Sequence, residues 1–120
     1  MLFRVAALWN IVNGLAVLVM PSLFLGLVYH YDAPLVAPFS TMYRFFWAFV
    51  VAFGVGYWRA ADDLASMRGA LWLGVAGKTI VGVYWLAEVA LGVASPLIVG
   101  GALGDLVFAA LFVKKLREAR

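Results

Sequence analysis

Long apolar stretches alternate with short polar ones along this sequence. A helix needs about 20 mainly apolar residues to cross the hydrocarbon core of a bilayer. Segments of roughly this length cover residues 4–25, 44–60, 69–93 and 96–113. The pattern therefore predicts four membrane-spanning helices.

The connections between these segments differ in length. The links at 61–68 (ADDLASMR) and 94–96 (ASP) are short, and short links place neighbouring helices antiparallel. We expect Asp62 or Asp63 to cap the third helix. The segment 26–43 is longer and holds two prolines, so an interfacial loop or a short surface helix is expected there. The predicted fold class is thus an all-α integral membrane protein, one domain built as an antiparallel bundle of four transmembrane helices.

Basic residues are distributed unevenly between the two predicted membrane faces. Arg44 is the basic residue of the face that holds segment 26–43, and Lys78 falls inside the third span. The opposite face holds seven, namely Arg4, Arg59, Arg68, Lys114, Lys115, Arg117 and Arg120. Because Lys and Arg accumulate on the cytoplasmic side of short loops, both termini are predicted to be cytoplasmic.

The composition agrees with a membrane location and argues against several kinds of chemical site. Hydrophobic residues make up 67% of the 120-residue chain and charged residues 12%, whereas a soluble domain carries roughly 25% charged residues. A domain this small cannot hide so much apolar surface from water, so we expect the lipid bilayer to be its partner. The absence of cysteine and the single histidine, His30, argue against disulfides, thiol chemistry and multi-ligand metal sites. No cofactor or metal is therefore expected.

Familiar catalytic motifs are absent from the sequence. It contains no G-x-S-x-G, no P-loop, no H-E-x-x-H and no dinucleotide fingerprint, and no catalytic residue is nominated. Base-reading elements are also missing, so nucleic acid is not an expected partner. Functional residues must therefore be sought among the polar side chains inside the predicted spans.

The third span, WLGVAGKTIVGVYWLAEVALGV, keeps two ionisable residues, Lys78 and Glu88. An ionisable side chain inside a bilayer costs about 2.5–3.5 kcal/mol on insertion scales, so each needs an explanation. A tight turn between the last two spans would set Asp105 level with Trp85, seven residues from Lys78. A Lys78–Asp105 bridge would then oppose the direction in which lysine snorkels. Structural pairing, a ligand or proton role, and a lipid or subunit contact stay open for this pair.

Other polar residues of the predicted spans also suggest partners. Glu88 lies near the level at which Arg44 enters the second span, so an Arg44–Glu88 pair is expected. Asn10 and Asn13 share one face of the first span with Gly14 through i, i+3, i+4 spacing. At a depth close to that of Lys78, the asparagines are expected to face the lysine or to act as interhelical hydrogen-bonding groups.

Four short pieces of the chain carry a resemblance to a known group of proteins. LWNIVNG, GYWRAADD, GVAGK and GDLVFAALF together resemble small bacterial membrane proteins of unassigned function that are broadly DoxX-like. The resemblance implies four helices, cytoplasmic termini, the bacterial inner membrane and a hydrophobic redox partner such as a quinone. The missing cysteines depart from the thiol chemistry linked to that group.

Three classes of function follow as hypotheses. The leading one is an accessory subunit of a larger membrane complex, or a binder of a lipid-soluble molecule such as a quinone, an isoprenoid or a lipid. The second is a homo-oligomeric, proton- or ion-linked transporter that uses Lys78, Glu88 and Asp105. The third is a membrane-embedded enzyme for an isoprenoid or sterol-like substrate, with Glu88 or Asp105 as acid or base.

Overall fold

The computed structural model describes residues 1–119, and this part of the chain forms helices joined by turns and one longer loop. Arg120, one of the basic residues assigned to the cytoplasmic face, lies outside the described residues. The elements are α1 (Leu2–Val19), α2 (Pro21–Tyr29), α3 (Phe39–Ala60), α4 (Leu64–Ala90), the short 3-10 helix η1 (Pro96–Ile98) and α5 (Val99–Glu118).

Within residues 1–119, four helical stretches are long and apolar enough to cross a membrane: α1, α3, α4, and η1 continued by α5. Large apolar side chains on these stretches remain uncovered; Phe49, Leu73 and Ile80 are 64–66% exposed. Water would hydrate such surfaces unfavourably, whereas hydrocarbon chains would not. The helices therefore suggest a multi-pass membrane protein.

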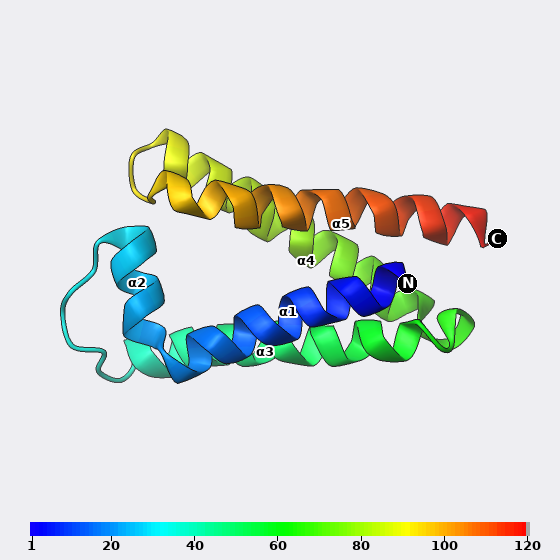
Figure 1. The fold of residues 1–120 in the computed structure, drawn as a ribbon, viewed down its shortest axis with the longest axis horizontal. Coiled ribbons are helices and arrows are strands. Elements are labelled where there is room, and N and C mark those ends of the chain that lie inside the picture. Colours follow the sequence, from blue (N-terminus) through cyan, green and yellow to red (C-terminus); the bar gives the residue numbers. More distant parts are fainter. Residues whose placement is uncertain (120) are drawn as a thin grey trace.

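The helices form two pairs (Figure 1). α1 packs along α3, and α4 packs along α5. The two pairs approach each other where α1 begins and where α3 leads into α4, and they are farther apart at the other end. The start of α1 and the end of α5 lie toward the same end of the molecule. The side chains do not fill the region between the pairs completely, because a cavity is lined by residues of both pairs.

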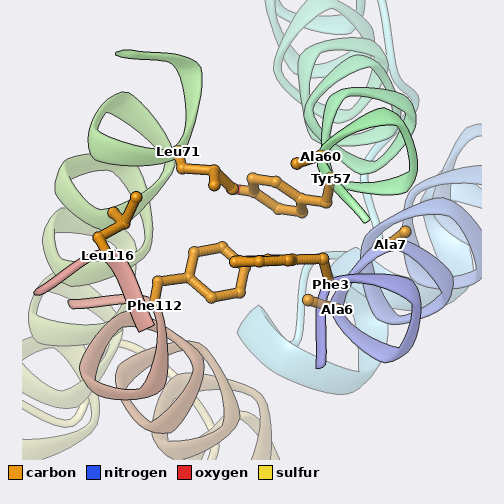
Figure 2. Packing of buried hydrophobic residues seen from close by; sticks show 8 residues of the cluster. All are labelled: Phe3, Ala6, Ala7, Tyr57, Ala60, Leu71, Phe112 and Leu116. Atoms are coloured by element: carbon orange, nitrogen blue, oxygen red, sulfur yellow. The ribbon is translucent and has the colours of Figure 1, made fainter. Parts of the chain in front are cut away.

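A cluster of buried side chains joins the two pairs at the end where they converge (Figure 2). Its members come from both pairs: Phe3, Ala6, Ala7, Tyr57, Ala60, Leu71, Phe112 and Leu116. The ring centroids of Phe3 and Phe112 lie 5.0 Å apart, and so do those of Tyr57 and Phe112. Rings at this distance add attraction beyond the burial of their area. The cluster thus holds α1 and α3 against α4 and α5.

α2 connects the pairs at the opposite end. Val28 of α2 packs against Ala94 and Ile98, in the connection between α4 and α5. The backbone N–H of Ser95 also donates to the carbonyl oxygen of Val28, at 2.6 Å. α2 therefore lies across the end at which the pairs diverge, as Figure 1 shows.

The predicted first span, 4–25, is wrong in its extent. α1 ends at Val19, Met20 leaves the helical conformation, and Pro21 begins α2. Proline has no backbone N–H to donate, so it is tolerated in the first turn of a helix and breaks a helix that would run through it. Because α2 continues to Tyr29, the predicted interfacial loop 26–43 begins inside a helix.

The other helices differ from the predicted spans mainly at their ends. α3 starts at Phe39 and α4 at Leu64, five residues before each predicted span of 44–60 and 69–93, and α5 ends at Glu118. Asp63 caps α4 as expected, because its carboxylate accepts a hydrogen bond from the Ser66 N–H at 3.1 Å. The alternative cap, Asp62, instead accepts from Arg4 at 2.9 Å. This contact joins the start of α1 to the turn between α3 and α4.

Candidate functional site

Lys78, Asp105 and Asn10 form a hydrogen-bonded cluster between the two helix pairs. Lys78 Nζ, from α4, donates to Asp105 Oδ1 on α5 at 2.7 Å and to Asn10 Oδ1 on α1 at 2.8 Å. All three residues are buried, with exposed fractions of 5%, 9% and 5%. The polar residues thus contact one another, and α1 turns Asn10 toward the lysine as the sequence predicts.

The expected depth of Asp105 is wrong by about one helical turn. Trp85 packs near Gly101 instead of facing Asp105, and Gly82 lies against the backbone of Ala102. The reason is the position of the chain reversal. α4 ends at Ala90, three residues before the predicted 93, and Gly92 takes a positive φ of 72° in the turn that follows. The early turn brings Asp105 within direct reach of Lys78.

Asn10 fixes the cluster to a further helix. Its Nδ2 donates to the carbonyl oxygen of Val50 on α3 at 3.2 Å, while its Oδ1 accepts from Lys78. The ammonium of Lys78 also lies 5.3 Å from the ring centroid of Phe108 and 5.6 Å from that of Tyr57. Aromatic faces attract cations at this separation. Side chains and backbone of α1, α3 and α5 therefore surround the charge that α4 carries.

A cavity of about 760 Å³ lies beside this cluster, between the two helix pairs. Its lining is mainly apolar and includes three tryptophans, Trp9, Trp47 and Trp85. The polar lining residues are Asn10, Asn13, Tyr57, Lys78 and Asp105. A mostly apolar cavity of several hundred Å³ with a few convergent polar groups is the usual form of a small-molecule site.

The cavity opens toward the outer surface of the helices. Leu23, Leu27, Phe46 and Phe49 line it and are also exposed. Asn13 lines it and is exposed too, and it makes no hydrogen bond within residues 1–119. The opening is thus bordered by apolar residues of α2 and α3, with the asparagine amide available inside it.

Several hydrogen-bonding positions around the cluster remain open within the described chain. A lysine ammonium carries three N–H groups, and Asn10 and Asp105 engage two of those on Lys78. Asp105 uses Oδ1 and not Oδ2, and the Tyr57 hydroxyl makes no hydrogen bond in residues 1–119. The ion pair can therefore offer a donor and an acceptor to a bound molecule without breaking its own contacts.

The expected Arg44–Glu88 pair is wrong. Arg44 is exposed, and no ion pair within 4.0 Å joins it to Glu88 in the described structure. Glu88 Oε2 instead accepts a hydrogen bond from the Tyr29 hydroxyl at 2.7 Å. Because Pro21 ends α1 and starts α2, Tyr29 is carried across to α4. Burial, reinforced by this hydrogen bond and by the charge of Glu88, raises the pKa of the Tyr29 phenol.

Some of the site residues carried no distinctive signal in the sequence. Tyr57, Trp47 and Trp85 were indistinguishable from the other aromatic residues of an apolar chain, yet they line the cavity. In the part of the chain that the structure describes, no group of three His, Asp or Glu residues is placed to hold a metal ion. The arrangement is suited to binding a molecule through apolar contact and a few hydrogen bonds.

Comparison with known proteins gives no match. No family model matches this sequence, and neither a curated protein nor a solved structure shows significant similarity to it. The DoxX-like resemblance therefore stays a prediction, and the class of protein rests on the fold and on the site.

Proposed function

We propose that this chain is a multi-pass protein of the bacterial inner membrane that binds a lipid-soluble molecule between its two helix pairs. The observation that carries the proposal is the cavity of about 760 Å³, mainly apolar and with the Lys78–Asp105–Asn10 cluster in its wall. Its exposed apolar border would give a ligand access from the hydrocarbon region of a bilayer.

The proposed topology is an antiparallel bundle with both termini in the cytoplasm. The unequal distribution of Lys and Arg supports it, because seven basic residues fall on the face assigned to the cytoplasm. That end also carries polar contacts, outside the apolar cluster. Arg4 pairs with Asp62 at 2.9 Å, and Arg68 donates to the carbonyl oxygens of Leu116 and Ala119 at the end of α5. Exposed charged groups of this kind suit the membrane–water boundary.

The charge balance of the cluster favours an uncharged ligand head. Asp105 already neutralises Lys78, so an anion or a cation beside the pair would lack a counter-charge in a poorly solvated space. A carbonyl or hydroxyl oxygen could accept from the remaining Lys78 N–H, and a hydroxyl could also donate to Asp105 Oδ2. A quinone, an isoprenoid alcohol or an uncharged lipid fits this requirement. The DoxX-like resemblance favours the quinone.

Filling the cavity tests the proposal directly. Gly77 lines the cavity, and a Cβ built there meets no atom within 4 Å, so Gly77→Leu would occupy ligand space without a backbone clash. Gly69→Leu is the matched control, since Gly69 is on the same helix, is equally open and does not line the cavity. Each protein is purified from native membranes in a mild maltoside detergent, and the solvent extract is analysed by liquid chromatography and mass spectrometry.

The expected result is a hydrophobic molecule that co-purifies with the wild type and with Gly69→Leu. Its amount should fall at least about tenfold in Gly77→Leu, because a filled site loses both the apolar contact and the access to Lys78. The same recovery from all three proteins, or none from the wild type, would overturn the proposal.

A further inference from the structure

A second cavity of about 600 Å³ lies next to the first. Residues of α2, the first half of α3 and the second half of α4 line it. The rings of Trp47 and Trp85, with centroids 6.2 Å apart and planes inclined by 28°, line both cavities. Most of the second lining is aromatic and comprises Phe24, Tyr29, Tyr31, Phe39, Tyr43, Phe46, Trp47, Tyr84 and Trp85. Glu88 is the one charged residue in it. This cavity is not part of the function proposed above.

Glu88 differs from Asp105 in having no counter-ion. Within residues 1–119 no Lys, Arg or His nitrogen lies within 4.0 Å of its carboxylate, whereas Asp105 is paired with Lys78. Its contact is the hydrogen bond from Tyr29, which engages Oε2. Glu88 also lies in the last turn of α4, where the helix dipole adds partial negative charge. A charged Glu88 carboxylate would therefore place a negative charge in this cavity with no counter-ion within 4.0 Å in residues 1–119.

The aromatic lining is continuous rather than scattered. Ring contacts connect Tyr31 to Phe39, Phe39 to Tyr43 and Tyr43 to Trp47, with centroid separations of 5.7, 6.1 and 6.4 Å. The faces of Tyr and Trp rings attract ammonium groups, and several rings around one carboxylate favour an organic cation over a hydrated metal ion. The lining thus matches a cation that is itself partly apolar.

Two buried polar atoms in the same lining, the Tyr43 hydroxyl and Trp47 Nε1, lie near each other but do not reach hydrogen-bond geometry, and neither has another partner in the described structure. Trp47 is 5% exposed, and its N–H can only donate. Buried polar groups without a hydrogen-bond partner are uncommon, and each is unfavourable unless a ligand or water satisfies it. The Tyr43 oxygen can accept from an ammonium N–H, while the Trp47 N–H requires an oxygen acceptor.

We infer that this second cavity binds an amphipathic organic cation, an ammonium group with an oxygen a few bonds away, held by Glu88 and the surrounding aromatic rings. The carboxylate supplies the counter-charge, and the rings stabilise the ammonium and its apolar substituents. The oxygen accepts a hydrogen bond from the Trp47 N–H, which reaches no acceptor at hydrogen-bond geometry in the described structure. Such a head occurs both in free amines and in the ethanolamine head group of a lipid.

The first experiment compares two probes of matched shape and opposite charge. Tetraphenylphosphonium and tetraphenylborate are titrated into the full-length protein in uncharged maltoside micelles, with heats corrected for protein-free micelles. The cation should bind at least about tenfold more tightly than the anion, since the cavity offers a carboxylate and ring faces to it. Equal binding of both probes, or tighter binding of the anion, would overturn the inference.

Substitutions locate the bound cation. Glu88→Gln should weaken tetraphenylphosphonium binding at least about tenfold, whereas Asp63→Asn removes the same charge at the other end of α4 and should leave binding unchanged. Trp85→Leu should weaken tetraphenylphosphonium binding several-fold, because it removes a ring face. This second variant tests the site even if Glu88→Gln fails to fold. Gly77→Leu, which fills the first cavity, should retain binding, so this inference can fail independently of the proposed function. Unchanged affinity in Glu88→Gln would overturn it.

A third experiment distinguishes the two possible ligands, a free amine and the ethanolamine head group of a lipid. Tetraphenylphosphonium is titrated into protein in nanodiscs of either phosphatidylethanolamine or an uncharged glucosyl-diacylglycerol. Competition by phosphatidylethanolamine, seen as at least about tenfold weaker probe binding, supports the site and identifies a lipid head group as its ligand. Equal binding in both lipids supports the site and identifies a free amphipathic amine. Failure of the probe to bind in either lipid would overturn the assignment.

Discussion

Replacement of Lys78 by methionine removes a charge from the cluster and keeps most of the length of the unbranched side chain. Lys78 and Asp105 are 5% and 9% exposed, and their charged atoms lie 2.7 Å apart. In Lys78→Met the carboxylate of Asp105 stays buried without its counter-ion. Asn10 loses the partner of its Oδ1 at the same time. We therefore expect the variant to lose more stability than the intact pair contributes.

The size of this loss follows from two opposing effects. Charges 2.7 Å apart attract by about 6 kcal/mol at an effective dielectric constant of about 20. Desolvation of both ions offsets much of that attraction, so the pair as a whole contributes little. Removal of one partner leaves the desolvation of the other uncompensated, and such losses amount to about 3–5 kcal/mol. The double variant Lys78→Met/Asp105→Leu should therefore lie within about 1 kcal/mol of the wild type.

Unfolding in mixed maltoside–dodecyl sulfate micelles measures these differences. Tryptophan fluorescence reports the transition, since Trp9, Trp47 and Trp85 line the cavity beside the pair. Lys114→Met is the control: Lys114 is exposed at the end of α5, and its loss should change the unfolding free energy by less than about 0.5 kcal/mol. A single Lys78→Met variant as stable as this control, or a double variant no more stable than the single one, would refute the reasoning.

Gly82→Ala should destabilise the protein by about 1–3 kcal/mol, because its new Cβ would lie 2.9 Å from a backbone carbonyl oxygen of α5, whereas Gly77→Ala should not destabilise it. Equal unfolding free energies for the two variants would contradict the close approach of α4 and α5. The Ser66 N–H lowers the pKa of Asp63, so the cap stabilises α4 above the ordinary aspartate pKa and is lost as the pH falls through the lowered value. Hydrogen exchange at the Ser66 amide, corrected for its intrinsic rate, should therefore accelerate on acidification, and constant protection would count against the cap. In this cysteine-free chain, a membrane-impermeant maleimide added to intact cells should label Asp32→Cys and not Ser66→Cys, and the reverse pattern would exclude cytoplasmic termini.

The positions of the four long helices could be predicted from the sequence, but the end of the first one could not. Length and hydropathy are enough to locate the four candidate spans of the described chain, because a spanning segment must be apolar over a fixed length. The Asp63 cap is also visible in the sequence, as an aspartate directly before an apolar run. Pro21 is equally visible, yet the run around it stays apolar, so hydropathy alone joined α1 to α2.

The sequence predicted the residues of the candidate site better than their contacts, since Asn10 faces Lys78 as expected but Arg44 and Glu88 do not pair. Lys78, Asp105 and Asn10 stand out because polar groups are costly in hydrocarbon and must turn inward. Their contact depended on where α4 ends, and a turn displaced by three residues moved Asp105 by about one helical turn. The partner of Glu88 was not predicted for a similar reason. Tyr29 belongs to α2, and the direction of that helix was not expected from the sequence.

The sequence by itself indicated that the chain suits a lipid environment, and it indicated which polar residues could form a site. A chain of 67% hydrophobic residues must expose apolar surface, and its few buried ions must find partners. The tertiary structure decided which partners these are and what space is left between them. That choice depends on the end of α4, the break at Pro21 and the packing of aromatic rings from separate helices. These features arise from contacts between residues far apart in the chain, and the hydropathy pattern carries no record of them.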